Sequence, residues 1–119
     1  MKMQSKNRYY LELLNFLRKK SREANAPIWR RVMELLERPK RRRVAVNISK
    51  INRYSKEGDI VVVPGKVLGS GSINHKVIIG AYDYSVTAYK KLKDSGCVIL
   101  SIKELVEKYP KGSGVKIIV

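Results

Sequence analysis

The chain has 119 residues, the length of one folded domain, and 44% of them are hydrophobic. That fraction supplies a modest core and excludes a wholly disordered chain. The sequence holds 26 lysine and arginine residues against 10 acidic residues, for a net charge of +16. Solubility requires only a modest net charge, so we expect a polyanionic partner, namely nucleic acid.

An anionic membrane surface is the alternative that charge alone leaves open. However, no segment reads as a basic amphipathic helix with a clean, bulky apolar face. No apolar run approaches the roughly 18 residues of a membrane-spanning helix, and the polar first residues argue against a signal peptide. The single cysteine, Cys97, excludes an internal disulfide and a multi-cysteine zinc site, and it is compatible with a reducing cytosol.

The first segment of the chain predicts a helix that begins near Asn7, a candidate N-cap. It ends in a cationic run over residues 18–22. Cations in the last turn of a helix complement its dipole. Four cations in five positions are more than the helix dipole requires, so phosphate contact is at least as good an interpretation. The apolar residues that recur at helical spacing are Tyr10, Leu13, Leu14 and Leu17.

A second helix is predicted after Asn25 or Ala26, either of which can be its cap, with Pro27 in its first turn. Pro39 ends this helix. Trp29 lies within the apolar stripe and we expect it in the core, although stacking on a base is the alternative. The stripe consists of Ile28, Trp29, Val32, Leu35 and Leu36, and the face away from most of it carries Arg30 and Arg31.

Residues 38–43 form a basic connector, in which five of six residues are cationic. Such a cluster repels itself unless a polyanion or salt screens it. Pro39 removes a backbone donor and disfavours helix at Arg38. We therefore expect a stiff, extended segment that presents its cations to nucleic-acid phosphates. Those cations are Arg38, Lys40, Arg41, Arg42 and Arg43.

A short strand is predicted over residues 44–46, and Asn47 can cap a brief helix over residues 48–54. Residues 60–63 are all β-branched and predict a buried strand, which Pro64-Gly65 ends. The brief helix is expected to carry Ile48, Ile51 and Tyr54 on one side and the cations Lys50 and Arg53 on the other.

The glycine-rich segment, residues 65–76, combines three glycines, short polar side chains, a histidine and two lysines. Exposed backbone donors and small side chains can approach phosphate closely. The segment lacks both the Gly-Lys-Ser/Thr spacing of a nucleotide-binding loop and the dinucleotide fingerprint. The sequence therefore favours either a phosphate-contacting loop or a plain glycine-rich hairpin.

The remainder of the chain predicts alternating strands and helices. Ser85 can cap one helix, which Gly96 closes, and Ser101 with Glu104 fits a capping box for another. This order predicts an α/β layer with parallel strands. The expected elements are a strand over 77–79, a helix to Asp94, a strand over 97–100, a helix to Lys108 and a strand over 115–118.

A catalytic site requires groups whose chemistry converges, and the sequence offers few. His75 is the only histidine. A pair of Cys97 with His75 is conceivable, but Cys97 opens an apolar strand, where a buried structural thiol is the expected reading. The few carboxylates have cap, turn or solvent positions. We therefore expect no catalytic residue, no metal and no cofactor.

Three ordered motifs give the chain a family resemblance. Residues 38–51, 61–69 and 75–77 resemble the archaeal and eukaryotic large-subunit ribosomal protein number eighteen, a family related to the C-terminal half of bacterial large-subunit ribosomal protein fifteen. The likeness extends from residue 25 to the end of the chain, and the short length is similar to that of archaeal members.

The resemblance implies an α/β fold in which N-terminal helices precede a compact core of irregular strand–strand–helix turns. We expect a single domain, with a basic helical region over residues 1–43 and an α/β core over residues 44–119. The implied role is that of a non-enzymatic component of the cytoplasmic ribosome, bound to large-subunit ribosomal RNA and neighbouring ribosomal proteins.

The candidate RNA-binding residues combine the connector, the cations after it, the exposed arginines of the second helix and the glycine-rich segment. They are Arg30, Arg31, Arg38, Lys40, Arg41, Arg42, Arg43, Lys50, Arg53, Lys66, Ser70, Ser72, Asn74, His75 and Lys76. A free-standing basic module that binds RNA or DNA is the alternative function. An RNA-processing enzyme that uses His75 is a third.

Overall fold

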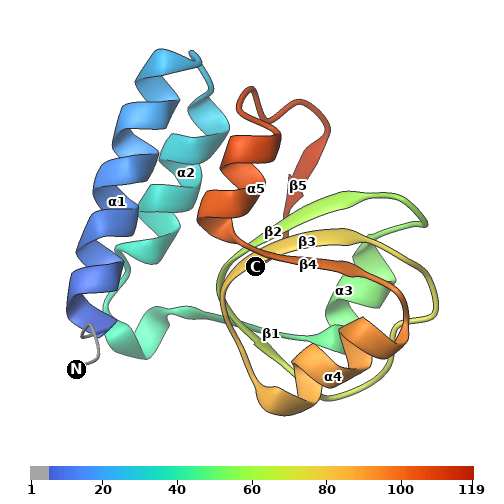
Figure 1. Cartoon of the computed structure of the whole chain (residues 1–119). Coiled ribbons are helices and arrows are strands. Elements are labelled where there is room, and N and C mark those ends of the chain that lie inside the picture. The colour runs from blue at the N-terminus through green and yellow to red at the C-terminus, as the bar shows by residue number, and fades with distance from the viewer. Residues whose placement is uncertain (1–5) are drawn as a thin grey trace, which may run out of the picture.

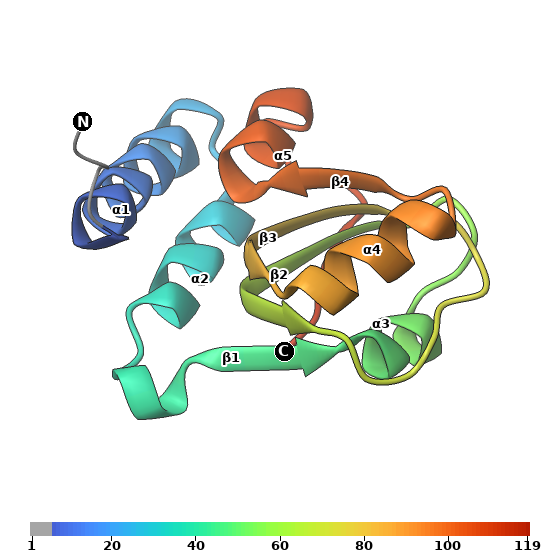
Figure 2. The same ribbon diagram turned by 60° about the horizontal axis from the view of Figure 1, so that its bottom comes forward.

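One sheet of parallel strands separates two layers of helices (Figures 1 and 2). The computed structural model describes residues 6–119. Helices α3 and α4 cover one face of the sheet, and α1, α2 and α5 cover the other. The helices are α1 (Lys6–Glu23), α2 (Pro27–Leu36), α3 (Ile48–Tyr54), α4 (Val86–Asp94) and α5 (Ile102–Lys108), and the strands are β1 (Val44–Asn47), β2 (Ile60–Leu68), β3 (Ile78–Tyr84), β4 (Val98–Ser101) and β5 (Val115–Ile117).

The sheet confirms the α/β class, and it also confirms the parallel arrangement that the order of strands and helices predicts. Strands β1 to β4 are neighbours in chain order, and β5 returns to pair with β2. The loop-to-helix transitions follow the expected caps. The Ser85 side chain accepts from the Ala88 amide, and Ser101 and Glu104 form both hydrogen bonds of a capping box.

Of the two predicted helix caps in the N-terminal region, one is wrong and one is confirmed. Asn7 lies inside α1, which already includes Lys6, so the prediction that Asn7 caps this helix is wrong. Ala26 is the cap of α2 and Pro27 is its first residue, as expected. No helix within residues 6–119 has the length and apolar character to cross a membrane.

Strand β2 is longer than the sequence predicts. It continues through Pro64 and Gly65, where the strand was expected to end, and reaches Leu68. The pairing with β3 shifts register between Val63 and Lys66, and this irregularity accommodates a proline that cannot donate to the ladder. One edge of β2 thereby pairs with β5 over residues 60–62 and with β1 over residues 65–68.

Apolar side chains form a core on each side of the sheet. On one side, residues of β1, α3 and α4 pack on the sheet, and on the other α1, α2 and α5 do so. Trp29 belongs to the second core and is fully buried, with its indole N–H donating to the Pro110 carbonyl over 2.7 Å. The prediction that Trp29 lies in the core is confirmed, and its ring is not available for stacking on a base.

The basic connector is not extended. Residues Lys40–Arg42 form one turn of 3-10 helix, closed by a hydrogen bond from the Arg42 amide to the Pro39 carbonyl (2.7 Å). The expectation of an extended connector is wrong because proline restricts the residue before it, whereas its own φ suits a turn that follows. The turn then leads directly into β1.

Close contact between β1 and β2 leaves no room for a side chain at Gly65. A Cβ at this position would collide with the backbone carbonyl of Val44. Gly65→Ala should lower the free energy of unfolding by about 2 kcal/mol or more, because β1 must move away from β2. Urea unfolding followed by circular dichroism measures the change. Lys66→Ala, at the exposed next position, is the matched control and should change stability by less than about 0.5 kcal/mol; equal stability of the two variants would contradict the prediction.

Candidate nucleic-acid interface

The cations of the N-terminal helices are partly neutralised by carboxylates on the same helices. Arg30 and Arg31 each have a guanidinium nitrogen 3.6 Å from Glu34, and Lys20 has its ammonium 3.3 Å from Glu23. Exposed ion pairs of this kind contribute little to stability, but each carboxylate reduces the local positive potential. The predicted pair Arg30 and Arg31 therefore offers less net charge to a phosphate than its sequence indicates.

The connector carries exposed arginines without such carboxylates. In the part of the chain that the structure describes, no ion pair involves Arg38, Arg41, Arg42 or Arg43. The Arg43 guanidinium lies 4.7 Å from the centre of the Tyr10 ring, a cation–π contact that anchors the end of the connector to α1. The side chain of Lys40 lies outside what the structure describes.

Lys66 joins the connector from the neighbouring strand. Its residue pairs with Ala45 of β1, and its side chain is exposed. Together with Arg43, Tyr10, Tyr82 and Asp83 it lines an open pocket of about 430 Å³ at the base of the connector, and Asp83 forms no ion pair with these cations. Four arginines and one lysine thus gather around the start of β1: Arg38, Arg41, Arg42, Arg43 and Lys66.

A second cationic group surrounds α3 and the β2–β3 loop, residues 69–77. The loop lies beside α3 (Figure 2), and backbone contacts hold it there. The Ser49 amide donates to the Ser70 carbonyl (3.1 Å), and the Ser70 amide donates to the side-chain oxygen of Asn47 (3.2 Å). Further along, the Asn74 amide donates to the side chain of Asn52 (3.1 Å). This places Lys50 and Arg53 of α3 beside Ser70, Ser72, Asn74, His75 and Lys76.

Helix α4 holds the other side of the same loop. The Lys91 ammonium donates to the carbonyls of Gly69 and Gly71, each over 2.7 Å, and the Ser95 hydroxyl donates to the Ile73 carbonyl over 3.0 Å. Gly71 adopts a φ of 90° and approaches Ser49 so closely that a Cβ would lie 2.5 Å from the Ser49 Cβ.

These contacts change the interpretation of the glycine-rich segment. Its first four residues belong to β2, so only residues 69–76 are loop. Within that loop, the amides of Ser70, Asn74 and Lys76 already donate to side chains of this chain. The loop is therefore not an open cradle of backbone donors. What it presents outward are the exposed side chains of Ser70, Ser72, Asn74 and Lys76.

Both ring nitrogens of His75 lie within hydrogen-bonding distance of other side chains of this protein. The Ser55 hydroxyl donates to the Ile51 carbonyl (2.6 Å), so its oxygen accepts from the His75 Nε2, which lies 2.8 Å away. The His75 Nδ1 lies 3.2 Å from the side-chain oxygen of Asn74. Cys97 places its Sγ 3.8 Å from the His75 backbone carbonyl, and burial raises the pKa of its thiol. A Cys97–His75 catalytic pair does not form, and Cys97 is a structural thiol.

Comparison with known proteins identifies the family. A family model described as "Ribosomal protein 60S L18 and 50S L18e" matches residues 1–119. The chain belongs to this family. The protein named "Large ribosomal subunit protein eL18" of Pyrobaculum aerophilum is 51% identical over 107 residues, covering 90% of this chain and 88% of that protein. The protein of the same name from Archaeoglobus fulgidus is 43% identical over 98% of this chain and its own full length.

This family is one of large-subunit ribosomal proteins and not of enzymes, which confirms the family resemblance and the non-enzymatic class. A third relative, from Methanothermobacter thermautotrophicus, is 46% identical over 98% of this chain and 97% of its own length. Among residues 6–119, no cluster of three or more histidine, cysteine, aspartate or glutamate side chains could hold a metal ion.

Sequence reasoning missed the residues that hold the site in place. The sequence predicts Asn47 as a helix cap, and it does stand at the cap position. Its side chain makes no cap hydrogen bond, however, and accepts instead from the Ser70 amide of the loop. Asn52 and Lys91 carry no local signal, because their partners lie 22 and 20 to 22 residues away in sequence. Only the long-range geometry reveals that these three side chains fix the loop.

Removing the Lys91 ammonium should loosen the loop without unfolding the chain. Lys91→Met keeps the aliphatic stem and leaves two carbonyls to water, a change of about 1 kcal/mol in local opening. Amide hydrogen exchange at Ser70 and Asn74 should become roughly fivefold faster. Lys90→Met, the adjacent exposed lysine of α4, is the control and should leave both exchange rates unchanged. Unaltered exchange in Lys91→Met would contradict the role of this ammonium.

The hydrogen bonds of Asp59, at the start of β2, should make the stability of the fold depend on pH in acid. Hydrogen bonds from the Lys116 ammonium and the Lys56 amide, each 2.8 Å long, hold the pKa of Asp59 below its ordinary value. A carboxyl with a lowered folded-state pKa stabilises the fold above its unfolded pKa of about 3.9, and this contribution is lost as the pH falls through the folded value. Asp59→Asn should therefore flatten the fall of melting temperature below about pH 4. Asp94→Asn is the control, and the same flattening in both variants would exclude a specific role for Asp59.

Proposed function

We propose that the chain binds large-subunit ribosomal RNA through two cationic groups that lie at opposite ends of β1. The connector group consists of Arg38, Arg41, Arg42, Arg43 and Lys66, and the loop group consists of α3 and the β2–β3 loop. The observation that carries the proposal is the gathering of cations without an ion-pair partner, within residues 6–119, at the two ends of β1. By contrast, Glu12, Glu23 and Glu34 pair with several of the cations of α1 and α2.

A rigid frame supports this role. The connector leads into β1, and β1 leads into α3, so the three follow one another along one side of the molecule (Figures 1 and 2). Four residues of extended strand span about 10 Å, which sets the two groups apart by more than one phosphate spacing. Both ends of this spacer are anchored, by the Arg43–Tyr10 contact at one end and by the loop hydrogen bonds at the other.

The binding mechanism is electrostatic and geometric. Lysine and arginine side chains neutralise phosphates and release counterions, and the folded core fixes where these charges stand. Each arginine also presents a forked pair of donors that matches a phosphate. Folded RNA is recognised largely through its shape, phosphates and 2′-hydroxyls, which suits hydroxyl and amide side chains such as Ser70, Ser72 and Asn74.

The relatives named above are proteins of the large ribosomal subunit. By extension, this chain is proposed to assemble into that subunit beside other ribosomal proteins and to stabilise the fold of the RNA it contacts. Arg30, Arg31 and Lys40 remain part of the proposed surface, with the pairing to Glu34 making the two α2 arginines the weaker contributors.

Loss of two connector arginines should weaken RNA binding and reduce its salt dependence. Arg41→Ala with Arg42→Ala removes two unpaired cations and should lower the slope of log affinity against log salt by about 1.4 to 1.8. Filter binding to large-subunit ribosomal RNA at several salt concentrations measures both. Lys108→Ala with Lys111→Ala removes the same charge at the last residue of α5 and in the turn after it, away from both cationic groups in the chain, and should lower the slope much less.

The wild-type chain supplies the first test of the phosphate model. For roughly six to ten phosphate contacts, its affinity should fall about 10³- to 10⁵-fold between 50 and 200 mM salt. A flat salt dependence would exclude the model. Sucrose-gradient sedimentation then separates a ribosomal component from a free-standing module, since the former stays with large subunits at moderate salt and the latter remains at the top of the gradient.

A further inference from the structure

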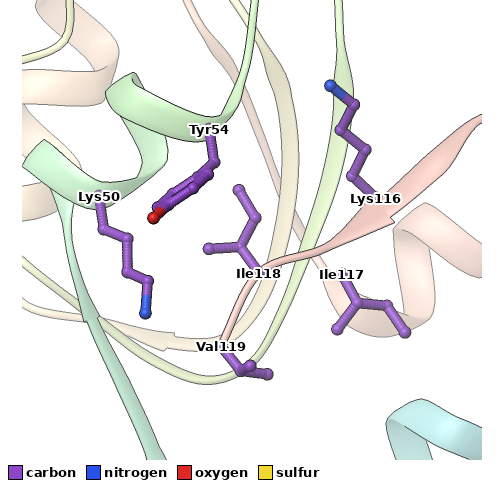
Figure 3. Close-up of a pocket in the computed structure, with 6 residues that line it drawn as sticks. All are labelled: Lys50, Tyr54, Lys116, Ile117, Ile118 and Val119. Carbon is purple, nitrogen blue, oxygen red and sulfur yellow. The ribbon is translucent and has the colours of Figure 1, made fainter.

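An exposed aromatic ring stands at the edge of the loop group, in a pocket between α3 and the C-terminal residues. The pocket has a volume of about 540 Å³ and is lined by Lys50 and Tyr54 of α3 and by residues 116–119 (Figure 3). Tyr54 is 55% exposed, in contrast to Ile48 and Ile51 on the same helix, which are fully buried. The sequence places all three on one helix side, but Tyr54 extends past the core into this pocket.

Apolar side chains form one wall of the pocket and face the ring. Ile118 is almost completely buried and extends toward the Tyr54 ring, and Val119 lies beyond it below the same ring (Figure 3). A flat, apolar molecule that entered here would therefore meet an aromatic face on one side and aliphatic side chains on the other. The volume falls within the range of about 300–1,000 Å³ that is typical of small-ligand sites.

Two cationic side chains lie next to the ring. The Lys50 side chain runs beside Tyr54 (Figure 3), and the Arg53 guanidinium lies 5.8 Å from the centre of the Tyr54 ring. Neither cation forms an ion pair in residues 6–119, and no acidic side chain lines the pocket. The third cation of the pocket, Lys116, is in an ion pair with Asp59.

From this arrangement we infer that the Tyr54 pocket binds an unstacked nucleobase of single-stranded RNA. The base stacks on the Tyr54 ring against Ile118, and the flanking phosphates contact Lys50 and Arg53. Aromatic side chains that stack bases next to phosphate-binding cations are the general means by which proteins hold single strands. A base inside a duplex cannot enter, because both of its faces are covered. The inference rests on the proposed RNA-binding function and assigns it a specific ligand.

The full-length chain can be tested with short RNA probes that separate the base from the phosphates. One probe is a fluorescein-labelled octamer of abasic ribonucleotides with a single 2-aminopurine at its centre, whose fluorescence falls when that base stacks. The second probe is an octamer with the same phosphates and no base at any position, called the abasic octamer. Anisotropy of the fluorescein label gives the affinity for each probe, and the 2-aminopurine signal reports stacking directly.

Tyr54→Ala should bind the 2-aminopurine octamer about 5- to 150-fold more weakly than the wild type, which is the expected loss for one stacked base. It should also abolish the quenching, while its affinity for the abasic octamer stays unchanged. Tyr54→Phe keeps the ring and should behave as the wild type in all three measurements. Tyr89→Ala is the matched control, since Tyr89 is 48% exposed on α4 but lies outside the pocket.

Three outcomes would overturn the inference: equal affinity of Tyr54→Ala and wild type for the 2-aminopurine octamer, an equal loss on the abasic probe, or an equal loss in Tyr89→Ala. These failures differ from a failure of the proposed function. If the wild-type chain binds large-subunit ribosomal RNA with steep salt dependence but Tyr54→Ala binds the octamer normally, only the base pocket is excluded. If the wild type shows no salt-dependent RNA binding, the proposed function is excluded and the pocket with it.

Discussion

The pairing of β1 with the second half of β2 is the constraint on which the rest of the structure depends. It requires β2 to continue past Pro64 and it requires a glycine at position 65, where the Val44 backbone leaves no room for a Cβ. Because β1 is only four residues long, this single ladder fixes both the connector before it and α3 after it. The loop that follows β2 lies along α3, where it forms hydrogen bonds with Asn47, Ser49 and Asn52.

Carboxylates of α1 and α2 neutralise some of the cations of those helices. Glu23 and Glu34 sit one helical turn from lysines and arginines of α1 and α2, where they form ion pairs at the surface. No described carboxylate pairs with the connector or with the cations of α3. A net charge as large as +16 disfavours the compact state through self-repulsion. Binding of a polyanion relieves that repulsion.

Local signals predicted much of this fold, and long-range contacts account for what they missed. The caps at Ser85 and Ser101, the core position of Trp29 and the parallel α/β order depend on neighbouring residues or on periodicity, which a sequence displays directly. The turn in the connector and the extension of β2 through Pro64 could not be predicted from neighbouring residues. A proline permits several conformations, and the contacts of the folded chain select one of them. The same holds for the candidate site. Its charged residues could be predicted from the sequence. The contacts of Asn52, Lys91 and Tyr54 could not, because they form only when α3, α4 and β5 pack together.

The place of β5 in the sheet has a consequence for synthesis of the chain. Residues 60–62 of β2 pair with residues 115–117, and the Trp29 indole donates to Pro110, so α2 and β2 acquire these partners only after residues 110–117 have been made. A ribosome that makes this protein therefore releases most of it before the sheet can close. Until then one edge of β2 stays open beside a strongly cationic segment, and an unpaired strand edge is a template for aggregation.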